Sequence, residues 1–519
     1  MSGPRATLLR HARPAGGRGT QDLLLVAGRV ARVAPGGTLG TDAGPAGATT
    51  VLDLAGRTVL PGLRDAHVHL TQWVVRRERL DLSGATSAAE TLALVRAALP
   101  TWPADLLVGH GFRDALWPDA PTLAALDAAV GARPVVLVSQ DLHCGWLSSA
   151  AADRLGVRPG TDGMLREGPW IHGLDLLDRD ARPPVGAYRE AGLAAARRGV
   201  VEVVDLENAD NATDWPARVA AGADALRVQA SVWPDRLDDA IARGLRTGDV
   251  LDLTGLVTMG PLKVVADGSL NTRTAWCWDP YPGLAADHPH PCGLPAVTPD
   301  ELDDLLDRAH RHGLHVTVHA IGDRTLSAVL DAFERHGSVD RHGSFDGRSP
   351  GTRASAPGTI EHAQLLRPAD LPRLARLGLV ASVQPEHALD DRAVADRYWA
   401  GRTDRAFAYR ALHEAGVPLR LGSDAPVAPL DPWQAIAAAV TRTRDDLPPW
   451  HPEQRLPREV AIAASTAVGR LDLRPGDVAD LVVLDADPLT APPETLRTLP
   501  VAATAVAGRW TWTCLEGTA

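Results

Sequence analysis

The sequence predicts an α/β protein: a parallel (β/α)8 barrel of the TIM type, with a large insertion after strand 1 and a small composite β-sandwich built from both termini. Three observations support this fold. Eight short segments rich in apolar and β-branched residues recur along the 519-residue chain, helical stretches separate most of them, and further strand-like segments stand at both ends. About eight alternations of strand and helix are typical of a barrel, although a doubly wound sheet could give a similar string.

The expected strands are short, and most of them end on polar residues. They are residues 59–66, 200–206, 226–233, 262–267, 315–319, 359–362, 380–384 and 418–424. The helical stretches between them include residues 299–312, 326–336, 369–377 and 409–415. In a barrel, the polar residues at the carboxyl ends of the strands meet at one mouth, so we expect the functional residues there.

Two parts of the chain stand outside this alternation. Residues 73–195 separate the first two strands by far more than a normal βα connection and contain apolar runs of their own, which predicts an inserted subdomain. The expected organisation is therefore the first part of the sandwich in residues 1–58, the barrel in 59–450, and a helix with the rest of the sandwich in 451–519. We also expect an exposed loop at residues 338–357.

Composition argues against several classes of protein. The formal net charge is −11 and no concentrated basic run occurs, so nucleic acid is not the expected partner. There is neither an apolar stretch of about 18 residues nor a signal-peptide pattern, so we expect no membrane span. The four scattered cysteines form no C-x-x-C pair and fit a reducing cytoplasm. The expectation is a cytoplasmic protein that binds a small-molecule substrate, and a homodimer is compatible with the chain.

Lys263 is the single lysine among 53 basic residues, all the others being arginine. A chain so biased towards arginine is expected to keep a lysine where an amine must become neutral, which a guanidinium cannot do. Such an amine can act as a base, form a Schiff base, or combine with carbon dioxide into a carbamate that bridges two metal ions. The ordinary alternative is a leftover surface lysine. The apolar residues on both sides favour a buried strand, where an unpaired ammonium is costly.

Residue types suited to binding divalent metals stand at the ends of five expected strands. His67 and His69 lie two apart on one strand, so both imidazoles can face the same ion. His-x-His alone is a weak signal, because a polar strand end gives the same pattern. Further candidates follow other strands: Lys263, His319, His362 and Asp424. Imidazoles and carboxylates suit zinc and related ions, and this set could hold two of them about 3.5–4 Å apart.

With these motifs, nearly the whole chain resembles the amidohydrolase superfamily of metal-dependent hydrolases. It looks most like the branch called amidohydrolase family 3, which includes YtcJ-like proteins and N-substituted formamide deformylase. The fold of that branch, a barrel with a composite β-sandwich, agrees with the one expected above. The segments that carry the resemblance are residues 61–70, 143–150, 263–275 (KVVADGSLNTRTA), 319–324 (HAIGDR), 360–365 (IEHAQL), 381–387 (ASVQPEH), 422–432 (GSDAPVAPLDP) and 474–488.

The resemblance implies a ligand set and a mechanism. His67, His69, Lys263 and Asp424 would hold one ion, and carboxylated Lys263, His319 and His362 the other, with zinc as the expected metal. A bridging water would act as a hydroxide nucleophile, and Asp424 would be the catalytic group that accepts its proton and passes it to the leaving nitrogen. The implied reaction is hydrolysis of an amide-type C–N bond in an N-acyl or N-formyl compound.

Other residues are weaker candidates. Asp65 and Asp267 could orient metal ligands or merely cap strand ends. Residues in or beside the resembling segments are expected substrate contacts: His143, Arg273, Gln384, His387, Trp73 and Trp276. For the tryptophans, ordinary packing is the competing interpretation. Asn271 stands where the family more usually has glycine.

Three alternative functions remain open. A ring deaminase of the same superfamily would have no use for a bridging lysine and would carry H-x-x-E after the fifth strand, where this chain has His319-Ala-Ile-Gly. A cyclic amidohydrolase would share the carbamate but lack the large insertion. A non-catalytic binding protein could retain the fold without the chemistry, although the intact ligand set argues against it.

Overall fold

The parallel barrel is confirmed in the computed structural model, which describes residues 6–40, 49–179, 183–285, 287–336, 358–444 and 446–515. Its strands follow one another in chain order and pair in parallel, from the first to the last. The strands are β6 (Leu63–Val68), β12 (Val200–Asp205), β13 (Arg227–Val232), β14 (Val257–Val265), β15 (Val316–Ala320), β16 (Gly358–His362), β17 (Val380–Val383) and β18 (Leu419–Leu421). A parallel bridge between Val68 and Ala425 joins the two ends of the sheet.

The first and fourth barrel strands differ most from the expected bounds, and the eighth ends at Leu421 instead of residue 424. The apolar run 59–66 is divided between β5 (Thr58–Pro61), which pairs outside the barrel with β1 and β19, and β6 within it. The break falls at Gly62, where a Cβ atom would lie 2.3 Å from Cγ1 of Val201. Strand β14 begins at Val257, earlier than expected, because a buried apolar run precedes Lys263.

Helices separate the barrel strands, as the alternation predicts. Helix α9 shows why one of them starts where it does, because Thr298 and Glu301 form a reciprocal capping box at its first turn. The helices around the barrel are α1 (Leu70–Arg76), α6 (Val185–Ala196), α7 (Asn211–Ala220), α8 (Leu237–Ala242), α9 (Pro299–Arg311), α10 (Asp323–His336), α11 (Leu371–Leu377), α12 (Pro385–Asp390), α13 (Arg392–Tyr398), α14 (Tyr409–Glu414), α15 (Pro432–Thr441) and α16 (Arg458–Ser465). The expected loop at 338–357 lies outside the described residues.

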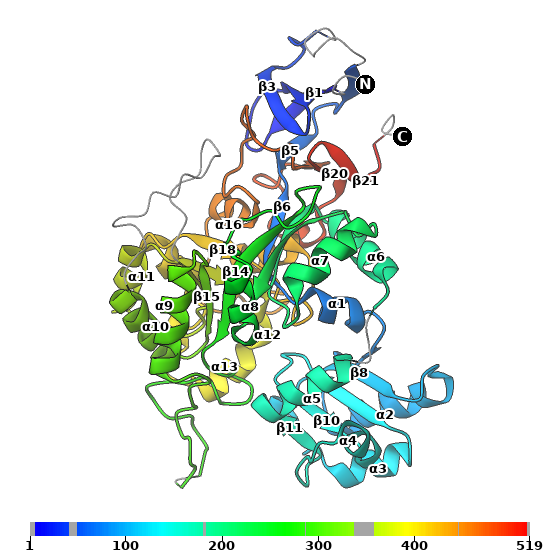
Figure 1. Cartoon of the computed structure of the whole chain (residues 1–519), viewed down its shortest axis with the longest axis vertical. Helices are drawn as coiled ribbons and strands as arrows, with labels where there is room; N and C mark the ends of the chain where they lie inside the picture. The colour runs from blue at the N-terminus through cyan, green and yellow to red at the C-terminus, as the bar shows by residue number, and fades with distance from the viewer. Residues whose placement is uncertain are drawn as a thin grey trace.

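The insertion folds around a five-stranded sheet of its own, in the order β11-β10-β9-β8-β7. Its strands are β7 (Leu80–Asp81), β8 (Leu107–Phe112), β9 (Val135–Ser139), β10 (Cys144–Leu147) and β11 (Met164–Arg166), and its helices are α2 (Ala88–Ala98), α3 (Leu123–Val130), α4 (Ser149–Leu155) and α5 (Glu167–Arg179). Two apolar clusters, one on each side of this sheet, are built from insertion residues alone. The insertion therefore has its own core, and it lies at one end of the barrel (Figure 1).

The strands of the two termini assemble at the other end of the barrel, where both ends of the chain lie in Figure 1. They are β1 (Ala6–Pro14), β2 (Gln21–Val26), β3 (Arg29–Pro35), β4 (Thr49–Asp53), β5, β19 (Leu481–Leu484), β20 (Val501–Val506) and β21 (Arg509–Thr513). Strand β1 pairs with β2 and β4 through its first part and with β5 through its last residues, with an irregular register and a positive φ at His11 between them. This bend brings amino- and carboxyl-terminal strands around one apolar core.

Short 3-10 helices complete the described secondary structure, at Leu99–Thr101, Asp114–Leu116, Pro234–Arg236, Thr403–Arg405, Pro452–Gln454 and Pro493–Thr498. Within the described part of the chain, none of the helices has the length and apolar character needed to cross a bilayer.

Candidate metal centre and substrate cavity

All six expected metal ligands line a single cavity at the carboxyl ends of the barrel strands. His67 lies near the end of β6, Lys263 and His319 lie within β14 and β15, and His362 is the last residue of β16. His69 follows β6, and Asp424 follows β18. The common barrel mouth thus brings together residues that are spread over most of the chain.

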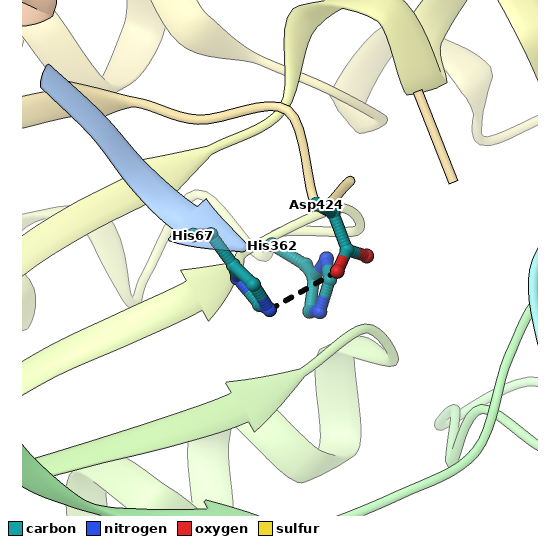
Figure 2. A group of neighbouring side chains, drawn as sticks. All are labelled: His67, His362 and Asp424. Carbon is teal, nitrogen blue, oxygen red and sulfur yellow. Dashed lines mark ion pairs between the residues drawn. The ribbon is translucent and has the colours of Figure 1, made fainter. Parts of the chain in front are cut away.

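Three of these ligands form a compact buried group. One ligand atom each from His67, His362 and Asp424 lies within 4.8 Å of the others (Figure 2). The Nε2 atoms of His67 and His69 are 3.2 Å and 3.3 Å from Oδ1 of Asp424. Tetrahedral zinc with bonds of about 2.0–2.1 Å requires neighbouring ligand atoms about 3.3 Å apart. The distances from His67 and His69 to Asp424 therefore fit a divalent ion bound by these three side chains.

His319 lies next to this group, because its ring is adjacent to that of His362. The rings of His319 and His362 have centroids 4.4 Å apart, and those of His67 and His362 are 5.0 Å apart. His362 adopts φ 69° and the following Ala363 φ 44°, both in the left-handed region that side chains rarely occupy. Asp424 adopts φ 56°. Backbone strain of this kind clusters at functional sites, where the surrounding structure holds it in place.

Lys263 lies in the same cavity with its amine unpartnered. The side chain is 2% exposed, and Nζ has no hydrogen-bond partner among the described residues. Burial lowers the pKa of Lys263, although the charges of Glu361 and Asp424 oppose the shift. A buried amine without a partner is unfavourable as an ammonium ion, so it suits a chemical role better than a packing role.

The pKa shifts of four expected ligands favour the forms that metal binding requires, whereas for His69 burial is outweighed by the hydrogen bond and charge of Asp424, which raise the pKa. Burial lowers the pKa of His67, and it lowers the pKa values of His319 and His362 much further. Burial alone would raise the pKa of Asp424, but the neighbouring imidazoles, led by His67, hold it well below its usual range. Neutral imidazoles and an ionised carboxylate are the forms that coordinate a metal.

Glu361 is a functional residue that the sequence analysis did not single out. Its side chain is buried, with Oε2 2.7 Å from Nδ1 of His67 and Oε1 accepting a 2.6 Å hydrogen bond from Oγ1 of Thr317. A carboxylate on Nδ1 directs Nε2 of His67 towards a metal. Gln384 approaches the same Nδ1 atom at 3.3 Å. The sequence signal for Glu361 was its position next to His362 at a strand end.

Asp65 and Asp267 occupy buried sites where they bind backbone groups. Oδ1 of Asp65 accepts hydrogen bonds from the amides of His67 (3.2 Å) and Ser423 (2.9 Å), so it links the first strand to the loop after the last one. Asp267 accepts hydrogen bonds from Ile321, Gly322, Trp276 and Thr325. Its Oδ1 is 3.6 Å from Nε2 of His319. Both aspartates therefore position backbone beside the ligands.

Gly422 permits close approach of the first and last strands. A Cβ atom at this position would lie 2.8 Å from the amide nitrogen of His67 and 3.1 Å from Oδ1 of Asp65. Any larger residue would push the Asp424 loop away from His67.

The cavity has a volume of about 180 Å³ and is lined by both the barrel and the insertion. Of the expected substrate contacts, His143 and His387 line it. Arg273, Gln384, Trp73 and Trp276 are described but are not among the lining residues: Arg273 lies over the ring of Tyr398, and the ring of Trp276 lies against Arg324. Lining residues that the sequence analysis did not single out include Gln140, Asp141, Trp233, Asp390 and Asp391.

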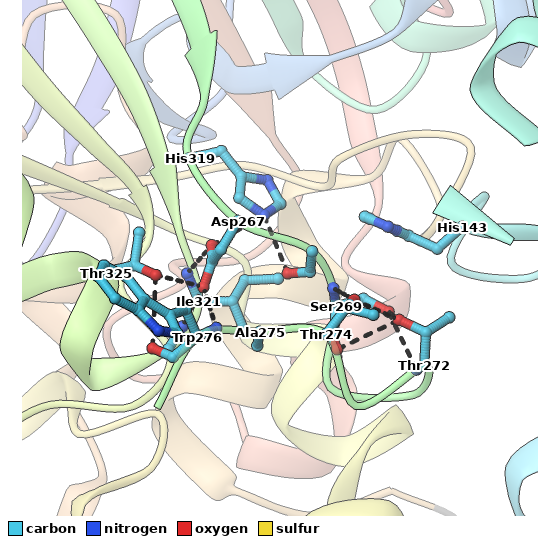
Figure 3. A network of polar contacts seen from close by, with 12 residues as sticks. His143, Asp267, Ser269, Thr272, Thr274, Ala275, Trp276, His319, Ile321 and Thr325 are labelled. Atoms are coloured by element: carbon cyan, nitrogen blue, oxygen red, sulfur yellow. Dashed lines mark hydrogen bonds and ion pairs between the residues drawn. The ribbon is translucent and has the colours of Figure 1, made fainter. Parts of the chain in front are cut away.

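His143 reaches the cavity from the insertion. Its Nδ1 atom is 2.9 Å from Oε2 of Glu167, and its ring centroid is 6.1 Å from that of His319. Figure 3 shows the His143 ring directed towards His319 across the loop that carries Ser269, Thr272 and Thr274. Burial opposes a charge on His143, but the charge and hydrogen bond of Glu167 outweigh it and raise its pKa to about 9.

Comparison with known proteins agrees with this geometry. The profile of the amidohydrolase family matches residues 50–511. The chain is 28% identical to the putative amidohydrolase YtcJ of Bacillus subtilis, over 89% of this chain and 90% of that protein. It is 26% identical to N-substituted formamide deformylase of Arthrobacter pascens, over 94% of both. A solved structure of an uncharacterised metal-dependent hydrolase from Pyrococcus horikoshii superposes with a TM-score of 0.75 at 24% identity, covering 94% of this chain and 99% of that one.

The match to the family spans most of the chain, and the barrel mouth holds a buried group of side chains suited to a divalent metal. We conclude that this chain is a metal-dependent hydrolase of carbon–nitrogen bonds and belongs to the amidohydrolase family.

Proposed function

We propose that the protein hydrolyses a non-peptide amide-type C–N bond in a small N-acyl or N-formyl compound, with two zinc ions bridged by N6-carboxylated Lys263. The observation that carries this proposal is the buried, unpartnered Nζ atom of Lys263, in a cavity that it shares with four expected histidine ligands and Asp424. A carbamate would replace an unfavourable amine by an anionic oxygen ligand. A Schiff base or a free base would leave the histidine cluster unexplained.

The two ions would be held by overlapping ligand sets. His67, His69 and Asp424 would bind one and His319 with His362 the other, with carboxylated Lys263 shared between them. When bound, the ions would lower the pKa of a water molecule between them and polarise the carbonyl of the substrate.

Asp424 would move the proton. Its ionised carboxylate would accept a proton from the attacking water as the new C–O bond forms, and would deliver it to the nitrogen as the C–N bond breaks. Oδ1 of Asp424 lies 3.3 Å from Nε2 of His69. Glu361 would accept a hydrogen bond from Nδ1–H of His67 and so leave Nε2 free for the metal.

Two observations support a small acyl compound as the substrate. The cavity volume of about 180 Å³ lies below the roughly 300–1,000 Å³ that drug-sized ligands occupy. The similarity to N-substituted formamide deformylase extends over 94% of both chains, insertion included.

The test is a hydrolysis screen with protein reconstituted in zinc or manganese, together with measurement of bound metal. The substrates are N-substituted formamides, larger N-acyl amines, lactams and ring amidines, and release of amine is followed. Asp424→Asn, purified in parallel, controls for contaminating hydrolases and should be inactive. We expect turnover of open-chain formamides or amides. Turnover restricted to amidines would identify a ring deaminase instead, and turnover restricted to lactams would identify a cyclic amidohydrolase.

A further inference from the structure

Asp391 lines the cavity, and its carboxyl group forms no ion pair with the described residues. It is the N-cap residue of α13, a position where aspartate is favoured because its side chain accepts a backbone hydrogen bond. Here the side chain makes no such bond and instead lines the cavity. The residue is partly buried, and its carboxylate has neither a hydrogen-bond partner nor an ion-pair partner within the described ranges.

The positive charges around Asp391 are already paired with other acids. Arg113 lies 3.0 Å from Asp390, and His143 lies 2.9 Å from Glu167. Asp390 also binds Arg444 at 2.6 Å. This part of the cavity therefore has more carboxylates than cations.

Asp141, a cavity-lining residue of the insertion, adds to the negative charge near Asp391. Its own oxygens accept hydrogen bonds from Ser139 (2.6 Å), the amide of His143 (3.1 Å) and Ser269 (3.2 Å), so its charge is stabilised locally. Among the described residues, Asp391 has no such donors. Burial, together with the charge of Asp390, raises the pKa of Asp391 to about 8, so the group is largely protonated at neutral pH and a bound cation would hold it in the ionised form.

The cavity also offers an apolar path beside Asp391. Val394 lies one turn beyond Asp391 on α13, and Ile171 and Leu174 contribute from α5 of the insertion. An apolar path next to a carboxyl group without a partner matches a ligand that combines an apolar stem with an N–H donor.

We propose that Asp391 is a specificity-determining residue that binds a positively charged nitrogen, so that the substrate is an amide carrying an ammonium group on a short apolar stem. This inference rests on the proposed amide hydrolysis and narrows its substrate class. Without a ligand, the carboxylate is unfavourable because it has no partner among the described residues. A bound ammonium group would donate a charge-assisted hydrogen bond to it.

The test compares a cationic substrate with its neutral isostere, for example an N-formyl diamine with the N-formyl alkylamine of the same length. For the wild-type protein we expect kcat/KM to be about 10–100-fold higher for the cationic compound, the range of one charge-assisted hydrogen bond. Asp391→Asn should abolish this preference, mainly by raising KM, and leave the neutral compound within about threefold. Asp391→Ser is a second variant that also caps a helix well.

Asp210→Asn is the matched control. Asp210 is likewise an N-cap without a side-chain cap bond, on α7, but it is exposed and outside the cavity lining. This variant should retain the preference for the cation. A linear diamine and the monoamine of equal length, titrated calorimetrically into the metal-loaded protein, provide a readout without turnover. The diamine should bind at least tenfold more tightly to the wild type and lose that advantage in Asp391→Asn.

The outcomes separate the two proposals. If the neutral compound is hydrolysed as well as the cationic one, and Asp391→Asn changes neither, the inference about Asp391 is overturned while amide hydrolysis stands. If neither compound nor any other amide is hydrolysed, amide hydrolysis fails and the inference falls with it.

Discussion

Glu361→Gln should weaken metal binding while leaving all six expected ligands in place. The Glu361 carboxylate is 2% exposed and lies 2.7 Å from Nδ1 of His67, where water does not compete. Glutamine has the same shape but only one accepting oxygen, which must serve either Thr317 or His67. If its amide faces Nδ1, the proton of the imidazole moves to Nε2, the atom nearest Asp424. Loss of such a carboxylate partner typically weakens metal binding about 10–100-fold, or about 1.4–2.7 kcal/mol.

The assay is competition for zinc with a chromophoric chelator, alongside urea unfolding of the metal-free protein. Glu202→Gln is the control, because Glu202 is another buried barrel glutamate but binds Arg64 (2.9 Å) and Gln229 instead of a histidine. We expect weaker zinc binding in Glu361→Gln alone. If both variants lose stability equally and zinc affinity stays within twofold of the wild type, the role assigned to Glu361 is wrong.

Two further substitutions test other parts of the site. Lys263→Arg should remain folded by circular dichroism but lose bound metal and activity, because a guanidinium cannot form a carbamate; a fully active variant would refute the bridging role. Glu167→Gln should change the pH dependence of thermal unfolding. The pKa of His143 rises from 6.5 to about 9 and that of Glu167 falls from 4.5 to about 2, so the pair stabilises the fold fully between pH 4.5 and 6.5. That stability is lost as pH rises through 9. The difference in unfolding temperature between the wild type and Glu167→Gln should therefore shrink over the same pH range. A difference that stays constant with pH would contradict the ion pair.

The barrel could be predicted because parallel strands leave strong local signals. Each barrel strand is a short buried run, and the helix between the fourth and fifth strands begins at a capping box that is visible as Thr298 and Glu301. The division of residues 59–66 could not be predicted, because both halves are apolar and only Gly62 lies between them. Which sheet each half joins is decided by long-range pairing with β19 and β12.

The meeting of the six expected ligands in one cavity could be predicted because they lie at strand ends, where the fold class fixes their common direction. Glu361 could not, because successive strand residues are expected to face opposite sides, and the positive φ of His362 that alters this is not visible in sequence. Asp391 and Gln140 reach the cavity from a helix start and from the insertion. The position of Gln140 depends on how the insertion docks, and that of Asp391 on how the helices after β17 pack; no local pattern encodes either.

The contact between the first and last barrel strands, β6 and β18, affects the stability of the whole barrel. Around the rest of the barrel each strand pairs with its sequence neighbour, but β6 and β18 meet through the Val68–Ala425 bridge and a few hydrogen bonds, including Asp424 N to His67 O at 2.7 Å. Asp65 and Ser423, bonded across this seam, are 358 residues apart in the chain. An ion shared by His67, His69 and Asp424 would act as a cross-link that closes this very long loop, the case in which closure entropy is largest. Removing the metal would therefore weaken the contact between β6 and β18 before the rest of the barrel. His67 and Asp424, on the two sides of this contact, also line the cavity where the substrate is expected to bind.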